Sequence, residues 1–321
     1  MRVSRLLAFA ATSSLLASCG GAGMQSVPAN PQSHSVAPAG PTIQSRTIVE
    51  NGITMHVLPA RGVTVLSDYH GITTLSRSAT TTSNLIYHGG PIQAVPHIFV
   101  VYWGPKWGTA PSNDPEYTVL NGFLSSIGGH SWINIDTQYY QTLGGTTTHV
   151  GNPSSQLTAT WIDTSSVPRK PTSSAVGAEA QKAALHFGYG GVSASYIVAI
   201  QSGNDPSGFR TSWCAWHSSE SESEGIVSFT NLPYQSDAGA SCGAGSVNSP
   251  GTYDGVTIVG GHEEAETQTD PQPNSGWLDS GGAEIGDKCA WVSLENNPNA
   301  GGYPTQPLWD NKVSGCAQSG P

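Results

Sequence analysis

The chain has 321 residues and a formal net charge of −10, from 12 Lys and Arg against 22 Asp and Glu. This acidic balance, with no run of basic residues, excludes nucleic acid as an expected partner. Only 11% of the residues are charged and 39 are glycine, a composition typical of an exported, loop-rich protein that contains strands. The length fits one large domain behind a leader, and we expect a monomer.

The first 18 residues have the pattern of a signal peptide. Arg2 and Arg5 form a positive n-region, and residues 6–16 form an apolar run that is too short to span a bilayer. Leu16-Ala17-Ser18-Cys19 then resembles a bacterial lipobox, with cleavage before Cys19 and lipid on its thiol. The alternative is an ordinary secretion signal in which Cys19 is incidental. We therefore expect export, either as a lipid-anchored cell-envelope protein or as an extracellular protein.

Three regions follow the leader. Residues 19–45 are rich in Gly, Pro, Ser and Ala, which predicts a flexible tether behind the lipid-bearing Cys19. Residues 46–84 contain the alternating run Ile53–Leu58, which predicts a β-rich lead-in or a pro-like segment. The main domain is expected over residues 85–321.

Strand and helix patterns alternate along the main domain. Strands are predicted for residues 97–103, 156–163, 195–201 and 226–231, and helices for residues 116–127, 173–187 and 253–268. This order predicts an α+β fold that resembles the zincin architecture. In that architecture a backing helix and a His-Glu active-site helix pack against a twisted mixed sheet.

Four cysteines remain once Cys19 is set aside, and an even number in an exported chain predicts two disulfides. Of the three possible pairings we expect the local one, Cys214–Cys242 and Cys289–Cys316, because it closes the shortest loops. A four-cysteine metal site is the alternative, but the sequence has no C-x-x-C spacing to support it.

The residues 260–271 carry the strongest chemical signal. His262 and Glu266 are four positions apart and therefore lie on one face of a helix, where both can bind one metal ion. Glu263 stands beside them as the expected catalytic base. This is the logic of the H-E-x-x-H zinc-protease helix, with Glu in place of the second His.

The remaining ligands are expected from downstream. Glu284 lies 18 positions after Glu266, a spacing that resembles the one in thermolysin-like gluzincins. This resemblance implies that Glu284 is the third metal ligand and that Asp287 orients the site from outside. Asp270 and His217 are lesser candidates, and His217 is expected to line the site. Zinc is the expected ion, and this carboxylate-rich set also suits calcium or manganese.

Two other features indicate different functions. Gly239–Gly243 matches the Gly-x-Ser-x-Gly pattern around Ser241, but no apolar strand precedes it and no helix follows it, as a nucleophile would require. The region near Asp279, Glu284 and Asp287 is acidic, which indicates a calcium-stabilised domain as a further alternative.

Several of these segments resemble the plant EXORDIUM (phosphate-induced) family and its bacterial relatives. The resemblance covers patches between roughly residues 85 and 295. It is carried by Tyr87-His88-Gly89-Gly90-Pro91, Val101–Gly104, Cys214-Ala215-Trp216-His217, the 261–271 segment, and Glu284-Ile285-Gly286-Asp287 with Cys289. It implies an extracellular protein, linked in plants to cell-wall growth responses. Its bacterial branch implies a zinc metallopeptidase.

These observations predict an exported, metal-dependent hydrolase that acts on a peptide or protein substrate, as a zinc peptidase would. The alternative is a non-enzymatic cell-surface binding protein in which the metal site is vestigial or structural. Under that alternative, tryptophans would form a carbohydrate-stacking surface, with Trp103, Trp107, Trp132 and Trp161 as its members.

Overall fold

The computed structural model describes residues 47–63, 83–222 and 225–320. The predicted signal peptide (1–18), the lipid-bearing Cys19 and the tether (19–45) lie outside the described residues. In the part of the chain that is described, no helix is long and apolar enough to cross a membrane.

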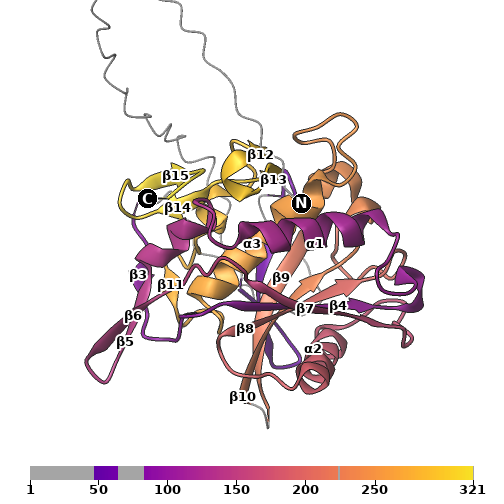
Figure 1. Ribbon diagram of the computed structural model, residues 1–321, viewed down its shortest axis with the longest axis horizontal. Coiled ribbons are helices and arrows are strands. Elements are labelled where there is room, and N and C mark those ends of the chain that lie inside the picture. The colour runs from indigo at the N-terminus through magenta and orange to yellow at the C-terminus, as the bar shows by residue number, and fades with distance from the viewer. Residues whose placement is uncertain (1–46, 64–82, 223–224, 321) are drawn as a thin grey trace, which may run out of the picture. The chain divides into compact units, whose positions relative to one another are not determined.

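A seven-stranded mixed sheet runs through the centre of the fold in the order β1-β2-β9-β10-β8-β4-β7 (Figure 1). The strands β10, β8, β4 and β7 run parallel to one another. The pairs β10–β9, β9–β2 and β2–β1 are antiparallel. Their bounds are β1 Thr47–Glu50, β2 Ile53–Pro59, β4 His97–Trp103, β7 Leu157–Asp163, β8 Ala194–Ile200, β9 Trp213–Glu222 and β10 Gly225–Leu232. The central strands β4 and β8 are continuous apolar runs because both faces of the sheet are covered there.

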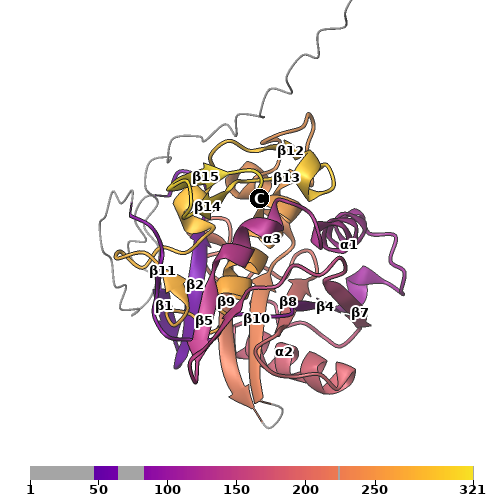
Figure 2. The same ribbon diagram turned by 60° about the vertical axis from the view of Figure 1, so that its left-hand side comes forward.

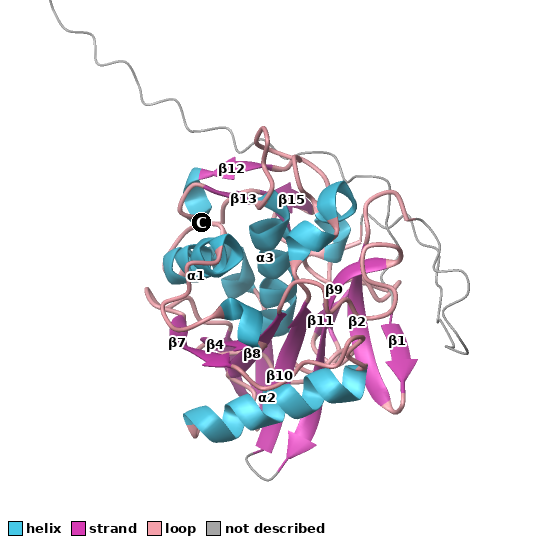
Figure 3. Ribbon diagram, turned by 90° about the vertical axis from the view of Figure 1, so that its right-hand side faces the viewer, coloured by secondary structure: helices cyan, strands magenta, loops and turns pink. Residues whose placement is uncertain are grey.

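Three helices cover the two faces of the sheet. Helix α2 (Ser173–Phe187) packs on one face, and α3 (Asp254–Thr269) lies on the other with α1 (Pro115–Ile127) against it (Figure 3). Asp114 caps α1 by accepting a hydrogen bond from the backbone N–H of Glu116 at 2.8 Å. Gly188 ends α2 with a φ of 63°, the left-handed conformation that glycine adopts without strain.

Helix α3 is buried on every side, and all 16 of its residues are inaccessible to solvent. Such close packing requires small residues: a Cβ on Gly261 would lie 2.9 Å from the Phe123 ring and 3.0 Å from that of Trp132. Because no face of this helix reaches water, each polar side chain on it must find its partners inside the protein.

Shorter elements complete the fold. Four two-stranded sheets pair β3 (Ile86–Tyr87) with β11 (Trp277–Leu278), β5 (Tyr140–Leu143) with β6 (Thr146–His149), β12 (Glu295–Asn297) with β13 (Tyr303–Thr305), and β14 (Leu308–Asp310) with β15 (Gly315–Ala317). The 3₁₀ helices are η1 Pro105–Trp107, η2 Ile133–Gln138, η3 Gln235–Asp237, η4 Gly239–Cys242, η5 Asp287–Cys289 and η6 Pro298–Ala300. Two disulfides join Cys214 to Cys242 and Cys289 to Cys316, which confirms the local pairing.

The predicted strands and helices between residues 97 and 268 are all present, with ends that differ by at most one residue. The mixed α+β fold is therefore confirmed. The expected boundary at residue 85 needs correction, because β1 and β2 are part of the same sheet and the same compact unit as the later strands. Strand β2 reaches that sheet by pairing with β9, which lies more than 150 residues later in the chain.

The disulfide Cys289–Cys316 holds together the C-terminal loops that follow α3. It closes a loop with a sequence separation of 27 residues. Replacing both cysteines with serine should therefore lower the free energy of unfolding by about 3 to 4 kcal/mol, because the unfolded chain regains the entropy that closing a loop of this length removes. Chemical denaturation measures this loss. An unchanged denaturation midpoint would contradict the assignment.

Candidate metal centre

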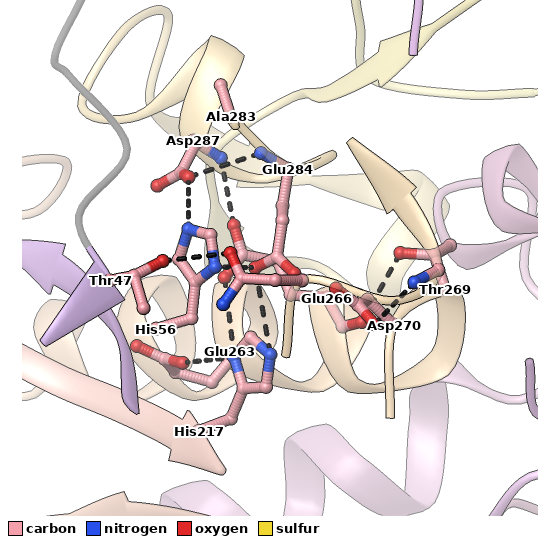
Figure 4. Close-up of polar contacts among 12 residues, drawn as sticks. Thr47, His56, His217, Glu263, Glu266, Thr269, Asp270, Ala283, Glu284 and Asp287 are labelled. Atoms are coloured by element: carbon pink, nitrogen blue, oxygen red, sulfur yellow. Dashed lines mark hydrogen bonds and ion pairs between the residues drawn. The ribbon is translucent and has the colours of Figure 1, made fainter. Parts of the chain in front are cut away.

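Seven ionisable side chains meet between the sheet, α3 and the loop before η5 (Figure 4). Six of them are 0% exposed and the seventh, Asp287, is 3% exposed. The three imidazoles and four carboxylates of this centre are His56, His217, His262, Glu263, Glu266, Glu284 and Asp287.

Helix α3 supplies three of these side chains from one end of the helix. His262 and Glu266 lie one turn apart, and the distance from His262 Nε2 to Glu266 Oε1 is 3.0 Å. Glu263, the next residue around the helix, places Oε2 at 3.2 Å from His217 Nδ1. The helical spacing therefore brings the predicted pair together and turns Glu263 toward the sheet.

The loop before η5 supplies Glu284 and Asp287, which are held by backbone contacts. The Asp287 N–H donates to Glu266 Oε1 at 3.0 Å, and the Glu284 N–H donates to Asp287 Oδ2 at 3.2 Å. Gly286 permits the close approach, because a Cβ there would lie 2.7 Å from His262 Nδ1. The disulfide at Cys289 ties the end of this loop to β15.

The sheet supplies the other two imidazoles. His56 on β2 is the direct partner of His217 on β9, and their rings stack with centroids 5.7 Å apart. The two nitrogens of His56 face two carboxylates, with Nδ1 at 3.1 Å from Glu284 Oε2 and Nε2 at 2.9 Å from Asp287 Oδ2.

Imidazoles and carboxylates alternate around the centre. His262 lies between Glu266 and Asp287, His217 between Glu266 and Glu284, and His56 between Glu284 and Asp287. In each of these trios, one donor atom from each residue lies within 4.8 Å of the others. Each of the three carboxylates is thus shared by two histidines, and the six residues surround one small volume.

Several donor atoms at the centre form no hydrogen bond with any described residue, although each is buried. They are His217 Nε2, His262 Nε2, Glu266 Oε2, Glu284 Oε1 and Oε2, and Asp287 Oδ1. Buried polar atoms are nearly always satisfied, so unsatisfied atoms grouped in one place indicate a missing ligand.

Two of the histidines are also fixed at Nδ1 by residues that lie outside the three donor trios. The Nδ1 atom of His262 faces Gln306 Oε1 at 3.3 Å, and the Nδ1 atom of His217 faces Glu263 Oε2 at 3.2 Å. An acceptor on Nδ1 holds the proton there and leaves Nε2 with its lone pair. This is the arrangement of histidines that bind metals.

The ionisation of the centre is set by burial and by opposite charges. Burial raises the pKa of Glu263 well above its usual value, and the neighbouring Glu266 and Asp287 add to the rise. Burial, Glu266 and Asp270 raise the pKa of Glu284 in the same way. For Asp287 burial acts upward but is outweighed by His56, so the pKa is lowered.

The histidines divide into two groups. Burial opposes the charged forms of His56 and His262, but Asp287 and Glu266 respectively outweigh it and raise their pKa values. Burial lowers the pKa of His217 well below its usual value, and His56 and His262 lower it further. His217 is therefore a neutral imidazole, the form that binds a metal.

The donor set fits a divalent ion. Zinc bonds to nitrogen and oxygen at about 2.0–2.2 Å, which puts adjacent ligand atoms about 3.0–3.6 Å apart. Here the distance between His262 Nε2 and Glu266 Oε1 is 3.0 Å, that between His217 Nε2 and Glu284 Oε2 is 3.6 Å, and that between His262 Nε2 and Asp287 Oδ1 is 3.8 Å. Imidazole nitrogens favour zinc over calcium.

The structure brings together all of the main residues selected from the sequence, with a different arrangement of roles. Glu284 lies next to His217 and His56, whereas Asp287 forms a donor trio with His262 and Glu266. Glu263 contacts His217. Glu284, the expected third ligand, and Asp287, which was expected to orient the site, therefore both lie in donor trios with Glu266.

Two residues of the centre were not selected from the sequence. His56 lies on a strand whose alternation is visible, but its partner on β9 is set by long-range pairing. Gln306 fixes His262 from a C-terminal segment and also donates to the Gly286 carbonyl at 2.7 Å. The one sequence signal for His56 was the presence of a histidine within a predicted β segment.

Other candidates lie beside the centre or apart from it. Asp270 is fully buried beside Glu284 and contributes to the rise in the pKa of that side chain. Asp270 accepts hydrogen bonds from the backbone of Ser275 and Gly276 after the end of α3. Asp279 accepts a hydrogen bond from Lys288 Nζ at 3.0 Å, whereas Glu284 and Asp287 belong to the centre. These three acidic residues therefore do not form one calcium loop. His88 is exposed and belongs to none of the donor trios found among the described residues.

The nucleophile pattern around Ser241 is not a nucleophile elbow. Ser241 lies within the 3₁₀ helix η4, and its hydroxyl donates to the Ala238 carbonyl at 2.9 Å. The next residue, Cys242, is bonded to Cys214. The strand-turn-helix geometry that exposes a nucleophilic serine is therefore replaced by a short helical turn.

Four tryptophans would form a carbohydrate-stacking surface under the alternative of a binding protein, and the structure contradicts that surface. Trp103, Trp107 and Trp132 are buried in the core. Trp161 is half-buried, and its ring stacks on His186 with centroids 4.0 Å apart. Packing in the core accounts for three of these rings, and a histidine covers the fourth.

Comparisons of the chain with protein-family models, with curated proteins and with solved structures found no match.

Gln306 provides a test of how the centre is oriented. Replacing Gln306 with leucine removes the acceptor for His262 Nδ1, which should weaken zinc binding about 10- to 100-fold. Competition with a chromogenic chelator measures the affinity. The matched control is Gln235→Leu, which removes a similarly buried amide that donates to the Cys214 and Pro233 carbonyls. Equal zinc affinity in the two variants would contradict the orienting role.

Proposed function

We propose that this protein is an exported, metal-dependent hydrolase that cleaves peptide bonds and holds zinc in the centre described above. The observation that carries the proposal is the group of buried, unsatisfied donor atoms from α3, β9 and the Glu284–Asp287 loop, with Nδ1 of two histidines fixed from outside. The two disulfides support an oxidising compartment and hence export. The same proposal includes the packing of α3 against the sheet in the manner of a zincin active-site helix.

The residues of the chain take distinct roles in this proposal. His262, Glu266 and Asp287 would hold the ion as one donor trio, and His217 and Glu284 would complete the set through the trio that they form with the same Glu266. A zinc ion held there supplies Lewis-acid chemistry, polarising a carbonyl and acidifying water. Glu263 uses Oε2 to orient His217, while its Oε1 has no hydrogen-bond partner among the described residues and can accept a proton.

A structural metal site is the second candidate function, and a specific observation favours it. Seven side chains with 0–3% exposure leave no open position in this conformation, and closed coordination is typical of structural zinc. In that case the chain would be a non-enzymatic extracellular binding protein, with the ion joining α3 to the sheet.

The first expected result concerns the metal itself. Elemental mass spectrometry of the purified protein should find about one zinc per chain, since one cluster of donors surrounds one small volume. Replacing His262 with alanine should abolish this zinc. Retention of a full equivalent by that variant would contradict the site. Calcium in place of zinc would contradict the choice of ion.

The second expected result separates the two functions. Replacing Glu263 with glutamine keeps the size of the side chain and an oxygen for His217 but removes the proton acceptor. Zinc should remain bound, while peptide hydrolysis should fall by a factor of about 100 to 10,000. Liquid chromatography of a peptide library digest measures the rate. Full hydrolysis in this variant would contradict the role of Glu263, and absence of hydrolysis in the unmodified protein would favour the structural function.

A further inference from the structure

The N-terminal segment formed by residues 47–63 reaches the metal centre from one edge of the central sheet. Its two strands lie at one edge of the sheet, where β1 pairs only with β2 and β2 pairs only with β1 and β9 (Figure 2). Without this segment the sheet would end at β9. The backbone groups of β9 that β2 now pairs would then be open, as at any sheet edge.

Contacts outside the ladder fasten this segment to three separate parts of the chain. The Ala60 N–H donates to the Ser212 carbonyl at 3.1 Å, and the Arg61 N–H donates to the Ser241 carbonyl at 2.9 Å. The Trp291 indole N–H donates to the Pro59 carbonyl at 2.8 Å. Strand addition with backbone hydrogen bonds is the mode by which proteins bind extended peptides.

The two faces of β2 are packed differently. On the side of the centre, His56 is fully buried between Glu284 and Asp287. On the other side, Met55 and Val57 line a cavity of about 50 Å³ together with Trp213, Trp216 and Lys170 of the remaining fold. The close packing is thus on the side of the histidine, and the opposite side is incompletely filled.

His56 completes the enclosure of the centre. Each of its two nitrogens contacts one of the carboxylates that also face His217 or His262. Its ring stacks on that of His217 with an interplanar angle of 1°. Since every other donor comes from residues 217–287, His56 is the one donor supplied by the described residues 47–63.

We propose that residues 47–63 are an intramolecular ligand of the domain, and that they add a strand to β9 and deliver His56 as a further donor that closes the metal centre. The closed state is the one in this structure, with His56 in contact with Glu284 and Asp287. Displacement of the segment opens one side of the centre to water and to larger molecules. The proposal rests on the metal centre of the proposed function, but it stands whether that centre is catalytic or structural.

Two altered forms of the full chain test the proposal by zinc release. In the first, a recognition sequence for a sequence-specific protease follows Val63, and the cut N-terminal fragment is separated by gel filtration. In the second, His56 is replaced with glutamine, which preserves volume. Both should release zinc to a chromogenic chelator at least about tenfold faster than the intact chain, as expected for loss of a group around the ion.

The matched control is Met55→Ala on the same strand. Met55 is also buried but lines the cavity on the opposite face, so zinc release should stay at the intact rate. Circular dichroism confirms that each variant is folded. Zinc release at the intact rate from both the cut chain and the His56 variant would overturn the proposal.

Peptide hydrolysis in the same samples distinguishes this proposal from the proposed function. Faster zinc release without hydrolysis in any sample would support the closing role of His56 and contradict a hydrolase. Equal hydrolysis by the intact and the cut chain would support a hydrolase and overturn the closing role. Hydrolysis that appears only after cutting would support both.

Discussion

The structure depends on holding four carboxylates and three imidazoles together away from water. An isolated buried carboxylate is costly, and four of them at one place repel each other. Burial and mutual repulsion raise the pKa values of Glu263 and Glu284, and pairing with imidazoles holds that of Asp287 low. A divalent cation held there would offset part of this negative charge and would stabilise the folded chain by about 4 kcal/mol at a thousandfold excess over Kd.

The same constraint explains why the centre is assembled from distant parts of the chain. Helix α3 is buried on all sides, so His262, Glu263 and Glu266 can find partners only within the protein. Strand β9 supplies His217, and the loop held by the Cys289–Cys316 disulfide supplies Glu284 and Asp287. An ion held at this centre would therefore act together with the disulfides, since each would fix segments that the hydrophobic core alone would leave less constrained.

The centre and the N-terminal segment also fit each other. A site that exchanges its ligands with solvent needs an open position, while the structure shows a site surrounded on all sides. His56 lies on strand β2, whose one partner in the sheet besides its hairpin partner β1 is β9. Under the proposal, the centre is buried while the segment is bound and becomes accessible when the segment leaves. The remaining donors then stay in place.

The sequence predicted what depends on local patterns. The strands and helices of the main domain follow from apolar periodicity, the α3 pair follows from a spacing of four residues, and the local disulfides follow from short loops. The role of His56 could not be predicted, because it depends on which strand pairs with β2 and in which register. For the same reason, the sequence could not predict that Asp287 lies beside His262 while Glu284 lies beside His217, because a loop conformation held by the Asp287 N–H on Glu266 decides it.

The most direct test of the central claim is anomalous diffraction at the zinc absorption edge from crystals of the zinc-loaded protein. The account predicts one strong peak inside the cluster, about 2.0–2.2 Å from His262 Nε2 and from carboxylate oxygens of the same centre. Absence of a peak among these side chains, or zinc only at exposed residues, would contradict it.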